Sequence, residues 1–161
     1  MVGIIVFIEV ISQGLADGLL DVFHVLVILL LTEECLDGEL DTLGHIVGDH
    51  VISSVSQKIC TVFSENDFVG RIGGDEFAVF MKLPALDKQQ WRGIIDKKAA
   101  AHCKFIDEVY SDGKSSVRIT SSIGISLYPN DGRNFEELYG KADLMLYNSK
   151  NSGKNKFSIC E

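Results

Sequence analysis

Residues 73–76 read Gly-Gly-Asp-Glu and lie between two apolar runs, Phe68 to Ile72 and Phe77 to Leu83. This pattern predicts a β-hairpin whose tight turn carries two adjacent carboxylates. Glycine adopts positive φ at no steric cost and lets a phosphate-bearing ligand approach the backbone closely. Adjacent carboxylates suit Mg²⁺, which prefers hard oxygen ligands and leaves coordination positions for substrate phosphates. The chemistry indicated is cation-assisted binding of a phosphorylated ligand.

Each of these signals has a structural alternative. A Gly-Gly-Asp-Glu turn on its own is equally expected as a solvated hairpin bend. Lys150 and Lys154, near the end of the last predicted helix, would lie one helical turn apart on one face and offer positive charge to phosphates. Taken alone, they are also what the helix macrodipole favours at a solvated C-terminus.

Helices are predicted where apolar residues recur every three or four positions. A stripe at steps of about four runs through Ile46 to Phe63, and a longer, less regular pattern runs from Leu86 to Val109. The last helix begins after Asn134, a good N-cap residue, and stops at Gly153. A short amphipathic helix is also expected at Val6 to Ala16.

Strands are predicted from apolar runs and from alternation. Val22 to Leu31 is typical of a strand covered on both faces, and Val117 to Tyr128 alternates with strand periodicity. Lys156 to Ile159 gives a last short strand, whereas the polar stretch Thr32 to Gly44 predicts a loop. Helices alternating with strands imply a layered α/β fold, and the absence of repeats or linkers predicts one domain over residues 1–161.

Composition narrows the class of protein. The 161 residues carry a formal net charge of -8, which disfavours nonspecific binding to nucleic acid or to an anionic membrane. The longest apolar run, Val25 to Leu31, is far below the ~20 residues of a membrane helix. The four cysteines form no CxxC pair, which favours reduced thiols over zinc or disulfides. A cytoplasmic location is expected, with any membrane anchor elsewhere in a longer parent protein.

Four segments resemble, in order, the signatures of the GGDEF family, the diguanylate cyclases. Residues 71–77 (RIGGDEF) are similar to the hairpin signature, and residues 44–49 (GHIVGD) to the GHxxGD that starts the preceding helix. Residues 120–126 (TSSIGIS) are similar to the TxSxGxS strand, and residues 142–155 (ADLMLYNSKNSGKN) to the ADxALYxAKxxGRN ending. Such a series is highly specific, and the resemblance covers about residues 7–157.

The resemblance implies both a fold and a reaction. The implied fold is an α/β (α+β) domain with a five-stranded, mainly antiparallel sheet and helices on its faces. Its βαββαβ core is the one seen in polymerase palms and class III nucleotide cyclases. The implied reaction condenses two GTP, one on each protomer of a homodimer, to cyclic di-GMP with loss of pyrophosphate, using Mg²⁺ or Mn²⁺. Other signalling domains are expected in a longer parent protein.

The resemblance also assigns roles, position by position. Glu76 would be a metal ligand, and Asp75 the acidic neighbour that helps to deprotonate the attacking hydroxyl. Gly73 and Gly74 would form the turn that approaches the substrate. Asp49 would accept hydrogen bonds from the guanine edge.

The chain departs from the family where a D-x-D-x-F-K-x-x-N-D run is expected. Counted back from the GHIVGD segment without a gap, the metal-binding aspartate falls on Thr32, whose hydroxyl is a weaker magnesium ligand than a carboxylate. The phosphate-facing lysine falls on Asp37, and the guanine-reading asparagine on Leu40, which cannot hydrogen-bond to a base. Glu33 or Glu34 would reach the metal site only if the strand slipped by a residue or two.

Further positions bear on the substrate and on regulation. Lys150 and Lys154 would hold the terminal phosphates, although Lys154 replaces the usual arginine and loses its bidentate fork. The inhibitory product site, an RxxD ending at Asp67, has Ser64 in place of the arginine, so product inhibition through it is not expected. The family's entry motif, DxLTxLxNRR before residue 7, is missing or altered.

These observations leave three hypotheses. The first is a diguanylate cyclase of weak or impaired activity. The second is a degenerate domain that binds GTP and acts as a regulatory or protein-interaction module in cyclic di-GMP signalling. A ligand-free structural domain is the least favoured, because the hairpin acids and both lysines are retained together.

Overall fold

The computed structural model describes residues 25–37, 44–63, 67–83 and 87–160. The short helix predicted at Val6 to Ala16 and position Leu40 lie outside the described residues. The elements run in the order β1 (Val25–Asp37), α2 (Gly44–Val62), β2 (Phe68–Gly73), β3 (Glu76–Leu83), α3 (Lys88–Ile106), β4 (Glu108–Ser111), β5 (Ser116–Tyr128), α4 (Phe135–Asn151) and β6 (Phe157–Ile159).

The described strands form one sheet in the order β2-β3-β1-β5-β4, with β6 also paired to β5. Every ladder is antiparallel except β5 with β6. The predicted α/β architecture with its βαββαβ core is confirmed. The described sheet has six strands where five were expected, because β4 and β6 pair with different parts of the long strand β5, at residues 116–119 and 123–125.

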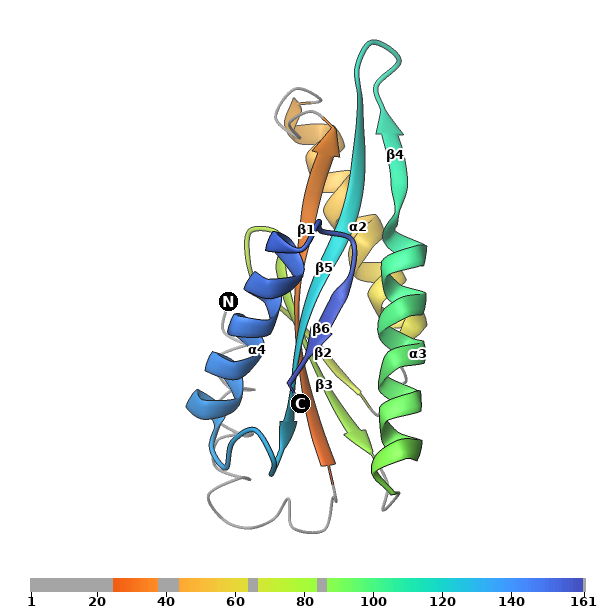
Figure 1. Ribbon diagram of the computed structural model, residues 1–161. Helices are drawn as coiled ribbons and strands as arrows, with labels where there is room; N and C mark the ends of the chain where they lie inside the picture. The colour runs from red at the N-terminus through yellow and green to blue at the C-terminus, as the bar shows by residue number, and fades with distance from the viewer. Residues whose placement is uncertain (1–24, 38–43, 64–66, 84–86, 161) are drawn as a thin grey trace.

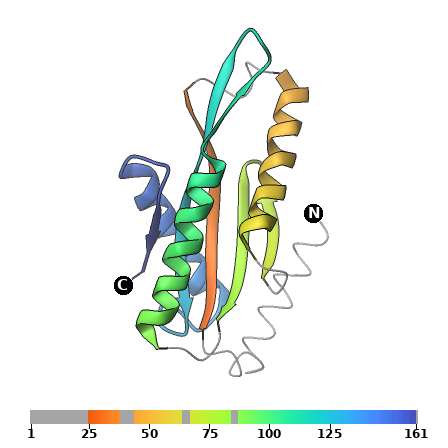
Figure 2. The same ribbon diagram turned by 90° about the vertical axis from the view of Figure 1, so that its right-hand side faces the viewer.

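The helices cover the two faces of the sheet. In Figure 1 the sheet is seen nearly edge-on, with α4 on one side and α2 and α3 on the other. Figure 2 shows α2 and α3 next to each other on the same face of the sheet. The central strand β5 is therefore covered from both sides, and Ile119 to Leu127 are all buried. Burial on both faces explains why this strand is nearly continuous in small and apolar residues.

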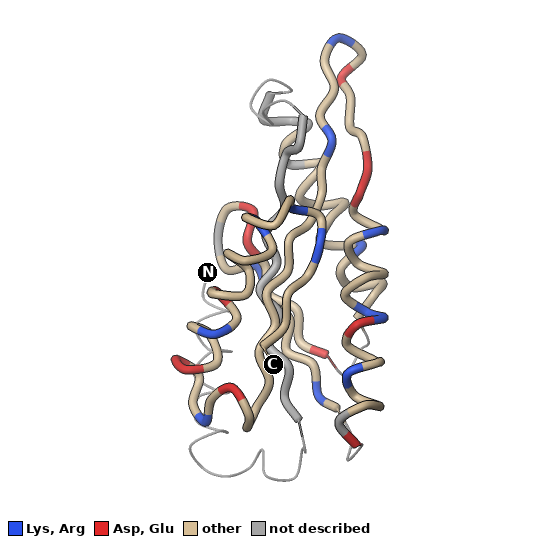
Figure 3. The backbone as a smooth tube through the Cα atoms, viewed as in Figure 1, with Lys and Arg blue, Asp and Glu red and all other residues tan. Residues whose placement is uncertain are grey.

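Two apolar layers hold the helices to the sheet. On the side of α2 and α3, the predicted stripe places Val51, Val55 and Ile59 in the larger core. On the other side, Leu138, Ala142 and Leu146 of α4 pack with Ala78 and Phe80 of β3. Figure 3 shows the charged residues on the outer helices, the hairpin and the β4–β5 tip, whereas the covered part of β5 carries none.

Side chains at the helix starts explain where two helices begin. Asn134 accepts a hydrogen bond from the Glu137 backbone N–H at 2.9 Å, as predicted for the N-cap of α4. Asp87 accepts from the Gln90 N–H at 2.8 Å, and the Gln90 side chain accepts from the Asp87 N–H, which completes a capping box for α3.

Two predictions of secondary structure were wrong, both at polar segments. Residues Thr32 to Asp37, predicted as a loop, continue β1 because β5 extends far enough to pair with them up to Arg118. Val109, predicted as the end of a helix, lies in β4, since α3 ends at Ile106. Long-range pairing with β5 decides both segments, and local apolar periodicity does not report it.

The side chains of three of the four cysteines, Cys60, Cys103 and Cys160, are described, and these three form no disulfide. None of the helices in the described ranges combines the length and apolar character needed to cross a bilayer.

Candidate active site

The Gly-Gly-Asp-Glu segment forms the predicted hairpin turn. Gly73 pairs with Glu76 at the ends of β2 and β3, and Gly74 and Asp75 make the bend between them. Gly74 has φ +43°, and a Cβ added there would meet nothing within 4 Å. The glycine is therefore required by backbone conformation and not by space. Gly74, Asp75 and Glu76 are all exposed, so the bend is open to a ligand.

Arg71 clamps this bend. Its Nε and Nη2 both donate to the carbonyl oxygen of Gly74, at 2.8 and 2.5 Å. Charge-assisted hydrogen bonds of this kind are stronger than neutral ones, so the guanidinium fixes the turn that presents the acids. Sequence reasoning gave Arg71 no role. The sequence feature that could have indicated this role is the position of Arg71 three residues before Gly74, whose carbonyl lies in the turn.

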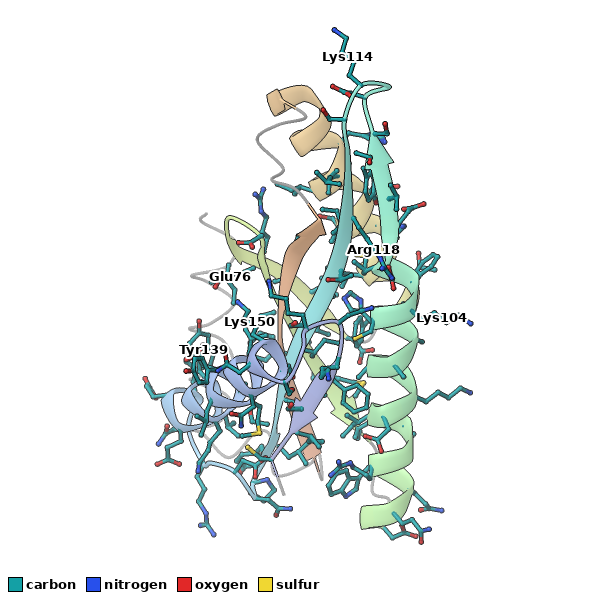
Figure 4. The ribbon with its side chains drawn as sticks, turned by 45° about the horizontal axis from the view of Figure 1, so that its top comes forward. Glu76, Lys104, Lys114, Arg118, Tyr139 and Lys150 are labelled. Atoms are coloured by element: carbon teal, nitrogen blue, oxygen red, sulfur yellow. The ribbon has the colours of Figure 1, made fainter. Side chains whose placement is uncertain are left out.

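Glu76 of the hairpin lies on the flank of the molecule that carries helix α4 (Figure 4). Burial raises the pKa of Tyr139, and the negative charges of Glu76 and Asp143 raise it further. Tyr139 is half-buried and packs on Phe135, with ring centroids 5.6 Å apart. Figure 4 shows Glu76, Tyr139 and Lys150 on one flank of the molecule. This flank thus carries the Glu76 carboxylate of β3 together with a phenol and a lysine of α4.

The strand register places three residues of neighbouring strands directly opposite one another, in one row (rung) across the sheet. Thr32 of β1 is opposite Glu76 of β3 and also opposite Ser122 of β5. The β1–β3 ladder runs from Val25 to Thr32 with an unbroken register. The slip that would bring Glu33 or Glu34 opposite Glu76 is thus not present, and these residues pair with Ser121 and Thr120 of β5. The backbone keeps the two expected metal-site positions adjacent.

The prediction that Lys150 and Lys154 lie one turn apart on a helix was wrong, because α4 ends between them. Lys150 lies in the last turn of the helix, but α4 ends at Asn151, and Lys154 lies beyond it. The N–H of Gly153 donates to the Lys150 carbonyl and the N–H of Lys154 to the Ser149 carbonyl, which is a Schellman motif. The two lysines are therefore not one turn apart on a helix face, because Gly153, at φ +111°, reverses the chain between them.

A model of the family described as diguanylate cyclase, GGDEF domain, matches residues 6–156. The chain belongs to the GGDEF family. It is 39% identical over 115 residues to the cyclic di-GMP phosphodiesterase NbdA of Pseudomonas aeruginosa, covering 71% of this chain and 14% of that protein. It is 35% identical over 121 residues to the diguanylate cyclase TpbB of the same species, covering 75% of this chain and 27% of TpbB.

The fold of this GGDEF domain matches solved structures of the family. The crystal structure of the GGDEF domain of TpbB, also called YfiN, superimposes with a TM-score of 0.78 at 26% identity, covering 96% of this chain and 93% of that one. The chain spans less than a third of the length of the curated relatives named above. Those relatives include both a cyclase and a phosphodiesterase.

The remaining site positions of this GGDEF domain lie on other elements. Asp49 is in the second turn of α2. Asp67, the predicted end of the inhibitory motif, has a side chain only 3% exposed, and its Oδ2 accepts from Lys98 Nζ at 2.7 Å. The same ammonium group lies 5.4 Å from the centre of the Phe63 ring. The carboxylate is thus engaged within the molecule, and Ser64 lies outside the described residues.

Proposed function

We propose that this GGDEF domain binds GTP with a divalent cation at the hairpin and condenses two GTP to cyclic di-GMP across a homodimer, with weak activity. The observation that carries the proposal is the exposed turn, clamped by Arg71, that carries Asp75 and Glu76, with Glu76 on the same flank as Lys150. Membership of the diguanylate cyclase family supports the choice of substrate and reaction.

The residues would divide the work as follows. Each ribose 3′-hydroxyl attacks the α-phosphorus of the other GTP, a new P–O bond forms, and the bond to the departing pyrophosphate breaks. Asp75 would take up the hydroxyl proton. Lys150 and Lys154 would neutralise the terminal phosphates that leave, and Gly73 and Gly74 would let the phosphates approach the backbone. Asp49 would accept hydrogen bonds from guanine.

The donor set at the turn fits Mg²⁺ or Mn²⁺ brought in with the nucleotide. Mg²⁺ is usually held by one or two carboxylates together with substrate phosphates, and Glu76 supplies one such carboxylate with Asp75 beside it. The described residues contain no group of three His, Cys, Asp or Glu that would hold a cation without substrate. When bound, the cation would stabilise charge on the phosphoryl oxygens. With Thr32 opposite Glu76, one carboxylate is replaced by a hydroxyl, and weak activity follows.

A second candidate function is a GTP-binding regulatory module without turnover. Thr32 in place of a metal-binding acid and Asp37 in place of a phosphate-facing lysine favour it. The curated relatives are much longer than this chain, so the module would control a neighbouring domain of a longer protein. Product inhibition is not expected in either case, because Ser64 lacks a guanidinium and Asp67 is paired with Lys98.

A turnover assay tests the proposal. The domain is incubated with GTP and Mg²⁺ or Mn²⁺, and the mixture is chromatographed for cyclic di-GMP. Wild type is expected to form product slowly, and Glu76→Ala to form none. Asp96→Ala is the matched control, because Asp96 is an acid on α3, on the opposite face from α4. Thermal stabilisation by GTP without product would establish the regulatory module. Neither product nor stabilisation would overturn both functions.

A further inference from the structure

The turn that carries Lys154 has an unusual backbone. After Gly153, both Lys154 and Asn155 have positive φ, at 57° and 47°. Left-handed backbone is unfavourable for residues with a Cβ, although asparagine tolerates it better than lysine. Two consecutive residues in this conformation persist only where surrounding contacts hold them, and such positions are often found at ligand sites.

A partly buried hydrogen bond to a residue far away in the sequence holds this turn. Asn155 Nδ2 donates to Asp107 Oδ2 at 3.0 Å, across 48 positions of sequence. Asp107 is the C-cap residue of α3, on the opposite side of the sheet from α4. In Figure 1 the chain after α4 crosses β5 before it descends as β6, which brings the turn towards the end of α3.

The Asp107 carboxylate is itself oriented by β5. Arg118 Nε donates to Asp107 Oδ1 at 2.7 Å and Arg118 Nη2 donates to Asp107 Oδ2 at 2.8 Å, which makes a bidentate ion pair. Figure 4 shows Arg118 beside the end of α3. Such a fork fixes the plane of the carboxylate, so the oxygen offered to Asn155 has a defined position. The hydrogen bonds from Arg118, and then from Asn155, hold the pKa of Asp107 below its usual range, so the group is a carboxylate at neutral pH.

We propose that Asp107, oriented by Arg118, is a positioning residue that holds the Lys154–Asn155 turn so that Lys154 is presented to the phosphates of the nucleotide. The inference rests on the proposed function, in which Lys154 binds those phosphates. Fixing the Asn155 side chain fixes the backbone on the C-terminal side of Lys154. The Schellman hydrogen bond from the Lys154 N–H to Ser149 fixes the other side. Lys154 is thus anchored to α4 and, through Asn155, to α3 and β5.

A purely structural role would give a different result from positioning. If Asp107 only joins α3 to the C-terminal turn, its removal lowers stability and leaves nucleotide affinity unchanged. If it positions Lys154, then Asp107→Ala and Lys154→Ala each weaken GTP binding, and the double variant loses little more than either single one. Non-additivity of this kind is the signature of residues that act through each other.

The experiment measures GTP and GMP affinity in the presence of Mg²⁺ by calorimetric titration of wild type and variants. Lys154→Ala and Asp107→Ala are each expected to weaken GTP binding about tenfold, the size of one charge-assisted contact, with GMP affinity unchanged. Glu108→Ala is the matched control. It removes the next residue's carboxylate from its ion pair with Lys58, without touching Asn155. It is expected to leave GTP affinity at the wild-type value.

Each outcome decides a separate question. If wild type binds GTP and Asp107→Ala binds it as tightly as Glu108→Ala does, the positioning role is overturned and the proposed function stands. If the losses of Asp107→Ala and Lys154→Ala add fully, the role is overturned as well. If wild type does not bind GTP, the proposed function fails and the inference fails with it. Should Asp107→Ala not fold, Asn155→Gly replaces it, because glycine keeps the left-handed backbone and removes only the amide.

Discussion

At the residue scale, the rung that places Thr32 opposite Glu76 predicts a gain of activity. Thr32→Asp would restore a carboxylate at the position that the strand register brings next to Glu76. We expect cyclic di-GMP formation with Mg²⁺ to rise on the order of tenfold, the usual effect of a group that supports metal binding. The rate is measured by chromatography of product. Thr61→Asp, an exposed Thr→Asp change on α2, is the control. An unchanged rate in Thr32→Asp would show that the missing carboxylate does not limit turnover.

The Arg71 clamp leads to a second prediction for a single residue. Arg71→Lys keeps the charge but loses the fork that donates twice to the Gly74 carbonyl. We expect weaker binding of Mg²⁺-GTP, because the turn that presents the acids becomes looser. Unfolding free energy should fall by only about 1 kcal/mol, the net value of one exposed hydrogen bond. Titration calorimetry and urea denaturation measure the two effects. Arg133→Lys, exposed before α4, should alter neither.

At the scale of elements, substitution of helix glycines and of a strand glycine should change stability in opposite directions. A Cβ at Gly140 of α4 or Gly93 of α3 would meet nothing within 4 Å, so Gly→Ala at either site should stabilise by about 0.5–1 kcal/mol. At Gly124 of β5, a Cβ would lie 2.0 Å from the Ala142 carbonyl oxygen and 2.2 Å from the Leu146 nitrogen. Gly124→Ala should therefore destabilise, because backbone of α4 would have to move. Urea denaturation measures all three, and equal effects at Gly140 and Gly124 would contradict the packing described.

Elements with strong local patterns were predictable, and those defined by distant partners were not. The stripe of α2 and the Asn134 cap of α4 are local features, and both are confirmed. Strand β4 and the polar end of β1 exist because β5 pairs with them, which no local window reports. The site divides in the same way. The hairpin turn follows from Gly-Gly-Asp-Glu, whereas the contact of Asp107 with Asn155 depends on the folded chain.

At the scale of the whole molecule, ion pairs between layers predict how stability depends on pH. Arg118 holds the pKa of Asp107 below its ordinary value, and Lys58 does the same for Glu108. Both carboxyls bind protons more weakly in the folded than in the unfolded state. Their contribution to the unfolding free energy is therefore complete above about pH 5 and is lost as the pH falls below about 4.

Asp107→Asn isolates this effect, because it removes the titrating group and keeps the side chain's shape. We expect the variant to be less stable than wild type at pH 7, by up to about 1 kcal/mol for a partly exposed pair. Near pH 3 the difference should shrink, because the wild-type carboxyl is then increasingly protonated and also neutral. Urea denaturation at several pH values measures both curves. A difference that stays constant from pH 7 to pH 3 would mean that the Asp107 charge does not link α3 and β5 to the turn after α4.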